Sequence, residues 1–147
     1  MTAFSLRPAD PSDLQAIKIL VHSAHINPTG LSWSRFVVAE DDSGEVVGCG
    51  QIKPHRDGSF ELASLVVAEN YRGQGIARSL VANLMANHQG NLYLMCRSSL
   101  EEFYKKLGFA PVSEPQMPSY FRRISRLASL AEFLQKEGET LLVMRKL

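Results

Sequence analysis

The sequence has 147 residues, 45% of them hydrophobic and 21% charged, which is the composition of one ordinary globular domain. Its 16 basic and 15 acidic side chains leave a formal net charge of +1, which gives no reason to expect nucleic acid or an anionic membrane as a partner. The N-terminal residues do not resemble a signal peptide, and no apolar run approaches the roughly 20 residues that span a bilayer. We expect a single domain over residues 1–147, in the cytoplasm or, if a transit peptide has been removed, in an organelle. We expect it to be either a monomer or a homodimer.

The cysteines and histidines do not predict a metal centre. Cys49 and Cys96 each lie in an apolar, strand-like run without metal-ligand spacing, so we expect two buried free thiols rather than a disulfide. His22 and His25 can share one face of a helix, but no third ligand has a suitable spacing. His55 lies in a turn and is expected to be exposed.

The first half of the chain predicts one helix and an antiparallel meander. Residues 4–7 are expected to form a short strand, and Asp10 or Ser12 can cap a helix that runs to about residue 25. Three strands joined by tight turns are expected to follow, at residues 36–40, 45–53 and 59–68.

The second half predicts alternating helices and strands. Apolar residues at helical spacing indicate a helix over residues 75–87, and the continuous apolar run at 92–96 indicates a strand buried on both faces. With the strand before it this makes a βαβ unit, so the sheet changes from antiparallel to parallel and the domain is α/β. The remaining expected elements are a helix over 98–107 ended by Gly108, a strand over 109–112, a helix over 122–136 and a strand over 140–145.

The segment 72–77, Arg-Gly-Gln-Gly-Ile-Ala, joins a buried strand to the first turn of a helix. That turn leaves unpaired N–H groups, and the helix dipole adds partial positive charge. Glycines permit unusual dihedral angles and let a phosphate approach the backbone closely. The segment therefore predicts a main-chain cradle for a phosphate or pyrophosphate, to which Arg72 and Arg78 add charge.

Two common phosphate-binding patterns do not fit this segment. A P-loop requires four residues between its glycines and then Gly-Lys-Ser/Thr, which is absent. A dinucleotide-binding fold requires a third glycine, where the chain has Arg78, and an acidic residue about 20 positions later, where the chain has an apolar strand. A third pattern, Gln/Arg-x-x-Gly-x-Gly/Ala, is met by Arg72, Gly75 and Ala77.

Together with residues 103–109, Phe-Tyr-Lys-Lys-Leu-Gly-Phe, this third pattern resembles the GNAT acetyltransferase superfamily over nearly the whole chain. The resemblance implies a mixed central sheet of six or seven strands with flanking helices. It is weakest at residues 115–139, which look like a helix added between the last two strands of the family.

The resemblance implies acetyl-CoA as the co-substrate, no metal, and direct attack of a deprotonated amine on the thioester. It places coenzyme A between the strand that ends near Val67 and the strand at 92–96, where a main-chain amide polarises the thioester carbonyl. The residues expected to contact coenzyme A are Leu65, Val66 and Val67 along the pantetheine arm, Arg72, Gly73, Gln74, Gly75, Ile76, Ala77 and Arg78 around the pyrophosphate, and also Arg97 and Tyr104.

Two residues match positions at which family members carry catalytic groups. Tyr104 matches the general acid that returns a proton to the leaving thiolate, and its alternative role is a half-buried aromatic on an amphipathic helix. Glu61 matches a general base, and its alternative role is an exposed carboxylate at a sheet edge. Arg97 stands where the family often has asparagine, so it meets a phosphate or an acidic substrate, or else forms a surface ion pair.

The family places its acceptor between the first helix with its following loop and the segment after Phe109. Those segments contribute His22, His25, Asn27, Trp33, Tyr120, Phe121, Arg122, Arg123 and Arg126. The three arginines either attract a carboxylate or phosphate or form a solvated helix face. The expected function is acetylation of the primary amine of a small molecule or peptide, and an amino acid is one candidate acceptor. The alternatives are protein N-terminal or lysine acetylation and a non-catalytic acyl-CoA-binding module.

Overall fold

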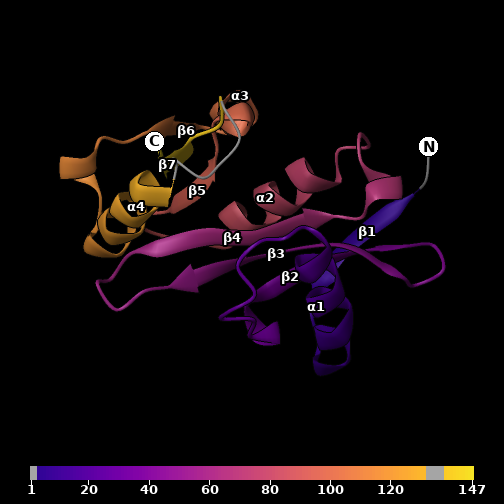
Figure 1. Ribbon diagram of the computed structural model, residues 1–147. Helices are drawn as coiled ribbons and strands as arrows, with labels where there is room; N and C mark the ends of the chain where they lie inside the picture. Colours follow the sequence, from indigo (N-terminus) through magenta and orange to yellow (C-terminus); the bar gives the residue numbers. More distant parts are fainter. Residues whose placement is uncertain (1–2, 132–137) are drawn as a thin grey trace. The chain divides into compact units, whose positions relative to one another are not determined.

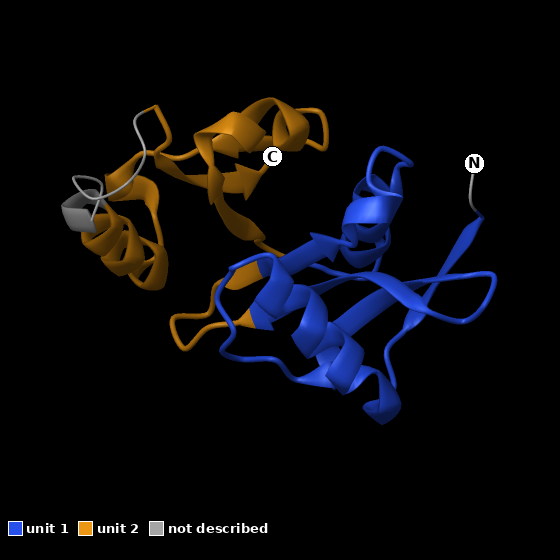
Figure 2. Ribbon diagram, turned by 45° about the vertical axis from the view of Figure 1, so that its right-hand side comes forward, with its two compact units in different colours: residues 1–53, 62–89 blue, residues 54–61, 90–147 orange. Residues whose placement is uncertain are grey.

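The computed structural model describes residues 3–131 and 138–147 (Figure 1). The chain divides into two compact units (Figure 2), which are described separately. Unit 1 comprises residues 1–53 and 62–89, and unit 2 comprises residues 54–61 and 90–147. The single domain expected over residues 1–147 stays a prediction.

Unit 1 is built on the antiparallel meander that the sequence predicts. Its strands are β1 (Phe4–Pro8), β2 (Phe36–Asp41), β3 (Val46–Pro54) and β4 (Phe60–Val67). The last residue of β3 and the first two residues of β4 belong to unit 2. The pairs β1–β2 and β2–β3 are antiparallel, with Leu6 opposite Ala39 and Val38 opposite Cys49. The strand boundaries agree with the sequence-based ones to within one residue.

Two helices cover opposite faces of this meander (Figure 1). On one face, α1 (Leu14–Ser23) buries Ile17, Leu20 and Val21 in a cluster that includes Cys49 of β3. On the other, α2 (Ile76–Ala86) buries Ile76 and Leu80 against Ala39 and Val47. The spacing of three and four residues between these apolar positions gives each helix one buried face. Asp10 caps the 3-10 turn Pro11–Asp13 that leads into α1, because its carboxylate accepts from the Ser12 N–H at 2.8 Å.

Unit 2 contains a three-stranded antiparallel arrangement and two helices. The strands lie in the order β5 (Tyr93–Arg97), β7 (Leu141–Lys146), β6 (Phe109–Pro111), and the helices are α3 (Glu101–Lys105) and α4 (Ser119–Ala131). Gly108 ends the α3 segment with φ +95°, as the sequence predicts. The inserted helix α4 begins three residues earlier than predicted, and the predicted part at residues 132–136 lies outside the described residues.

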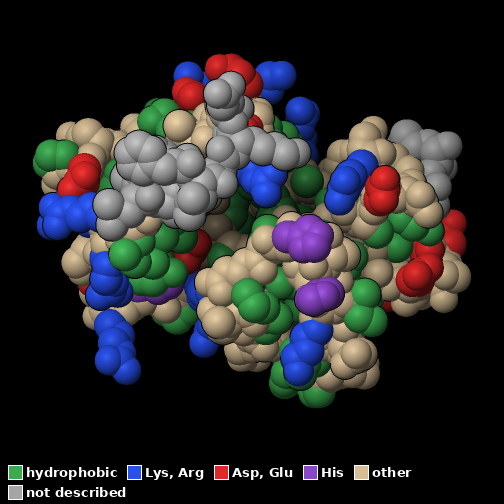
Figure 3. All heavy atoms as spheres, in the orientation of Figure 1, with side chains coloured by type: hydrophobic (Ala, Val, Ile, Leu, Met, Phe, Trp, Pro, Cys, Tyr) green, Lys and Arg blue, Asp and Glu red, His purple; other side chains and the backbone are tan. Residues whose placement is uncertain are grey.

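Both cysteines are buried and unpaired, as expected, and burial raises the pKa of Cys49 to about 12. In the part of the chain that the structure describes, no helix has the length and hydropathy needed to cross a membrane. Acidic and basic side chains both occur on the face drawn in Figure 3.

Candidate active site

The segment between β4 and α2, residues 72–78, is named the cradle below. Gly73 and Gly75 adopt φ values of +79° and +84°, a left-handed conformation that disfavours every side chain with a Cβ, and Gly75 is the N-cap of α2. A Cβ built on either glycine meets no other atom within 4 Å. Backbone conformation rather than crowding therefore requires glycine here, and the space above both residues is open. The unpaired N–H groups of the first helical turn lie directly after them.

The side chains of the cradle differ in how deeply they are buried. Ile76 is 2% exposed and packs in the core, so only its backbone is available to a ligand. Arg72 and Arg78 are exposed, and Arg72 Nε donates to the Val67 carbonyl at 3.2 Å. Within the described part of the chain, the buried Gln74 Oε1 has no hydrogen-bond donor. An anionic ligand with hydrogen-bonding groups fits this open, donor-rich turn.

The strand that leads to the cradle is irregular at Ser64. Ser64 has φ +57°, which is left-handed and rare for a residue inside a strand, so the regular geometry of β4 is interrupted there. The side chains of the next three residues are partly or fully buried among apolar neighbours, Val66 on the α1 side and Leu65 and Val67 on the α2 side. Their backbone groups, and not their side chains, are what a ligand along this strand can use.

Glu61 is buried, so the alternative of an exposed edge carboxylate is wrong. Its side chain is 8% exposed, and Glu61 Oε1 lies 2.9 Å from His55 Nε2. His55, expected to be exposed, is also mostly buried, with 11% of its side chain accessible. The His55 ring stacks on Tyr120 with the centroids 3.6 Å apart and the planes inclined by 16°. We name Glu61, His55 and Tyr120 the Glu61 cluster.

The turn between β3 and β4 is tied to the start of α4. The Asp57 carboxylate accepts from the Tyr120 N–H at 3.0 Å and from the Ser119 hydroxyl at 3.2 Å. Burial opposes the charge of Asp57, but the hydrogen bonds from Ser59, Tyr120 and Ser119 together lower its pKa to about 2. Asp57 thus holds in place the helix end that carries Tyr120.

Tyr104 on α3 is buried rather than half-buried, with 8% of the residue exposed. Its ring makes edge contacts with Phe103 and Phe109, at centroid distances of 5.0 and 6.1 Å. Burial raises the pKa of Tyr104 to about 12, so the phenol keeps its proton at neutral pH. Phe109 is part of the core.

Arg97, at the end of β5, is mostly solvent-exposed. Its side chain is 73% accessible, and Arg97 Nε lies 3.9 Å from Glu139 Oε2. This geometry corresponds to the surface ion pair among the sequence-based alternatives. Its contact with coenzyme A stays a prediction.

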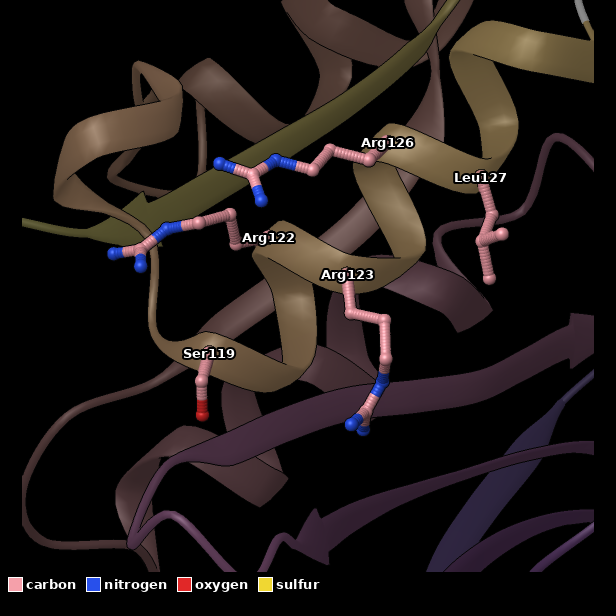
Figure 4. Close-up of a pocket in the computed structure, with 5 residues that line it drawn as sticks. All are labelled: Ser119, Arg122, Arg123, Arg126 and Leu127. Atoms are coloured by element: carbon pink, nitrogen blue, oxygen red, sulfur yellow. The ribbon is translucent and has the colours of Figure 1, made fainter.

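The three arginines of α4 lie on two sides of the helix (Figure 4). Arg122 and Arg126 extend to one side, where Arg122 donates to the Met117 carbonyl at 2.9 Å and Arg126 pairs with Glu114 at 2.5 Å. Arg123 extends to another side, with its guanidinium 5.9 Å from the centre of the Tyr120 ring. A surface pocket of about 320 Å³ is lined by Ser119, Arg122, Arg123, Arg126 and Leu127. None of the residues predicted to contact coenzyme A lines it.

The other residues predicted to contact the acceptor differ in burial and in hydrogen bonding. Phe121 is fully buried and packs on Tyr93, so it is a core residue and the prediction of an acceptor contact is wrong. His22 and His25 are exposed, and Asn27 Oδ1 accepts from the Thr29 N–H at 3.0 Å. Trp33 is partly buried in a short 3-10 turn, Trp33–Arg35. No group of three potential metal ligands occurs among residues 3–131 and 138–147.

Solved structures resemble this chain along its length. N-acetylglutamate synthase from Neisseria gonorrhoeae, complexed with coenzyme A and N-acetyl-glutamate, matches 99% of this chain with a TM-score of 0.74 and 22% identity. This chain spans only 35% of that enzyme. Rv2747 from Mycobacterium tuberculosis, in complex with CoA, matches 95% of this chain and 97% of its own, with a TM-score of 0.68 and 25% identity. A GNAT-family acetyltransferase from Staphylococcus aureus matches 98% of both chains with a TM-score of 0.71 and 15% identity.

These likenesses confirm the predicted fold class, a mixed α/β domain with flanking helices. A search of curated proteins by sequence finds no match. A family model described as an acetyltransferase (GNAT) domain matches residues 32–111, more than half of the chain, and this range includes Ser64, the cradle and Tyr104. The chain therefore belongs to the GNAT acetyltransferase family.

Proposed function

We propose that this protein is an N-acetyltransferase that moves an acetyl group from acetyl-CoA to the primary amine of a small molecule or peptide. The observation that carries this proposal is the cradle, in which two left-handed glycines and the open first turn of α2 form an anion site. Membership of the GNAT family supports it further. Acetyl-CoA supplies the activated acetyl thioester and the pyrophosphate that such a site fits.

Donor binding uses the backbone of two consecutive segments of unit 1. The amides of residues 73–78 bind the pyrophosphate, with added charge from Arg72 and Arg78. The backbone of Leu65, Val66 and Val67 binds the pantetheine arm, and an amide next to the left-handed Ser64 polarises the thioester carbonyl. Gln74 Oε1 accepts a hydrogen bond from bound acetyl-CoA, which gives this buried oxygen a partner.

Glu61 is the proposed general base. When the acceptor nitrogen attacks the carbonyl carbon, a C–N bond forms, the C–S bond breaks and the nitrogen must lose a proton. His55 Nε2–H donates to Glu61 Oε1 and orients the carboxylate, so Oε2 takes this proton. Tyr120 holds the imidazole by stacking, and His55 is therefore a positioning residue.

Tyr104 is the proposed general acid. A buried phenol with a pKa of about 12 remains protonated until a strong base forms beside it. The departing thiolate is such a base, and the Tyr104 O–H donates a proton to it. Solvent then returns a proton to the tyrosine.

An amino acid is one proposed acceptor, because the gonococcal neighbour is an N-acetylglutamate synthase. Protein N-terminal or lysine acetylation is the alternative within the enzymes, and acyl-CoA sensing without catalysis is the alternative outside them. The proposed site of action is the cytoplasm.

The test combines coenzyme A binding with thiol release from acetyl-CoA in the presence of amino acids, polyamines, lysine peptides and N-terminal peptides. We expect binding and amine-dependent thiol release. Tight binding without thiol release for every amine would favour the sensor, and absence of binding would contradict the cradle assignment.

A further inference from the structure

Two polar residues of β3 in unit 1, Gln51 and Lys53, lie on the face of the strand that α1 covers. Cys49 belongs to the apolar cluster of α1, and a Cβ on Gly50 would lie 3.2 Å from Leu84 of α2. Side chains alternate between the two faces of a strand. Gln51 and Lys53 therefore share the face of Cys49, toward the end of β3.

Gln51 is fully buried and incompletely paired. Its Nε2 donates to the Gly30 carbonyl at 3.2 Å and to Ser64 Oγ at 2.9 Å, which fixes the orientation of the amide. Its Oε1 is buried and accepts no hydrogen bond from any described residue. A buried amide oxygen without a donor costs free energy, which makes it a candidate for contact with a ligand.

Lys53 is the cation next to it. The residue is only 9% exposed, because Gly30, with φ +68°, crosses over its alkyl chain. A Cβ on Gly30 would lie 2.5 Å from Lys53 Cε, so any other residue at position 30 would displace the lysine. Within the described residues no carboxylate lies within ion-pair distance of Lys53 Nζ, and no hydrogen bond engages it. A largely buried lysine without a counter-ion is a cation available to an anionic ligand.

We propose that Lys53 and Gln51 form the acceptor subsite and that the acceptor carries a carboxylate in addition to its amine. The proposal rests on the acetyltransferase function. The Lys53 ammonium binds the carboxylate, and Gln51 Oε1 accepts an N–H of the same molecule. The hydrogen bond from Gln51 to Ser64 Oγ places the pair beside the left-handed Ser64, the residue before Leu65. The thioester carbonyl is proposed to lie next to this same part of β4.

The test uses L-amino acids and their amides, which differ in the carboxylate, and compares kcat/KM for each pair. Wild type is expected to prefer the acid by at least about tenfold, the effect of roughly 1.4 kcal/mol. Lys53→Met keeps the alkyl chain and should remove this preference through KM for the acid, while the rate with the amide stays within about twofold. Lys53→Arg should retain most of the preference. Lys18→Met, the same change at an exposed lysine of α1, should match wild type.

A wild-type enzyme without preference for the acid, or a Lys53→Met variant that keeps it, would overturn the proposal. If no amine supports thiol release, the acetyltransferase function fails, and the subsite is then judged by calorimetric titration of the coenzyme A-loaded protein with the same acid and amide pairs. Binding of the acid that Lys53→Met abolishes and Lys18→Met preserves would still support the subsite. Equal binding by all variants, or no binding of the acid by wild type, would contradict it.

Discussion

The cradle and the Glu61 cluster differ in how they are built. The cradle is a continuous stretch of seven residues whose shape comes from two left-handed glycines and the start of a helix. The Glu61 cluster joins a turn, a strand and a helix start, and Asp57 of that turn holds the helix start although it lies 63 positions before Tyr120. Main chain defines the first site and packed side chains define the second. Substitutions should accordingly break donor binding at one site and catalysis at the other.

The largest effect is expected at the cradle. Gly75→Val forces a β-branched residue into a left-handed conformation and moves the first amides of α2 away from the ligand. We expect coenzyme A affinity to fall at least about 100-fold, roughly 2.7 kcal/mol, as measured by calorimetry. Gly44→Val is the matched control, because Gly44 has φ +85° and equally open surroundings but lies in the β2–β3 turn. Equal loss of affinity in both variants would show a general effect of strain rather than a cradle.

The next effect separates catalysis from binding. Tyr104→Phe removes the proposed acid but keeps the buried ring and its contacts with Phe103 and Phe109. We expect kcat to fall about 10²–10⁴-fold with an unchanged dissociation constant for coenzyme A. An unchanged kcat would remove Tyr104 from the mechanism.

A smaller effect is expected from His55→Ala, which leaves Glu61 in place but removes its orienting donor. We expect kcat to fall roughly 10–100-fold with KM for acetyl-CoA unchanged, which is less than the roughly 10²–10⁴-fold that a general base itself contributes. His55→Gln, which keeps an N–H donor, should lose less, and added imidazole should partly restore the alanine variant. His22→Ala, at an exposed histidine, should match wild type.

The relation between His55 and Glu61 can be tested with a double variant. If both act through one carboxylate, adding His55→Ala to Glu61→Gln should cost little more activity. Additive losses would show that His55 acts independently of Glu61.

The smallest effect concerns stability. Asp57→Asn weakens the anchor of α4 and should lower the free energy of unfolding by about 1 kcal/mol, as for other helix N-terminal caps, measured by urea denaturation. Because folding lowers the pKa of Asp57 from 3.8 to about 2, its contribution is complete above about pH 4 and is lost as the pH falls toward 2. The difference between wild type and Asp57→Asn should therefore shrink at low pH. A difference that is constant from pH 7 to pH 2 would contradict this role.

The cradle could be predicted from the sequence because its determinants are local. Gly73 and Gly75 are required by their own dihedral angles, and the apolar spacing of α2 fixes where the helix begins. The meander was equally accessible, because β-branched runs separated by turn residues determine it.

The surroundings of Glu61 and Lys53 could not be predicted in this way. His55 follows a proline in a polar turn, and the Tyr120 and Phe121 rings that contact it come from the inserted helix. Lys53 reads as an exposed residue at a strand end, and the left-handed Gly30 that crosses it is 23 positions away in a loop. No periodicity or spacing signals either contact, because each depends on tertiary packing of an irregular segment.

The most direct measurement of the central claim follows the acetyl group itself. Wild-type protein and Tyr104→Phe are incubated with acetyl-CoA labelled in the acetyl carbons and with the amine panel, and the products are analysed by mass spectrometry. We expect a labelled N-acetyl product from wild type, formed at least about 100-fold more slowly by Tyr104→Phe. Tight binding of coenzyme A with no labelled product from any amine would contradict the proposed acetyl transfer.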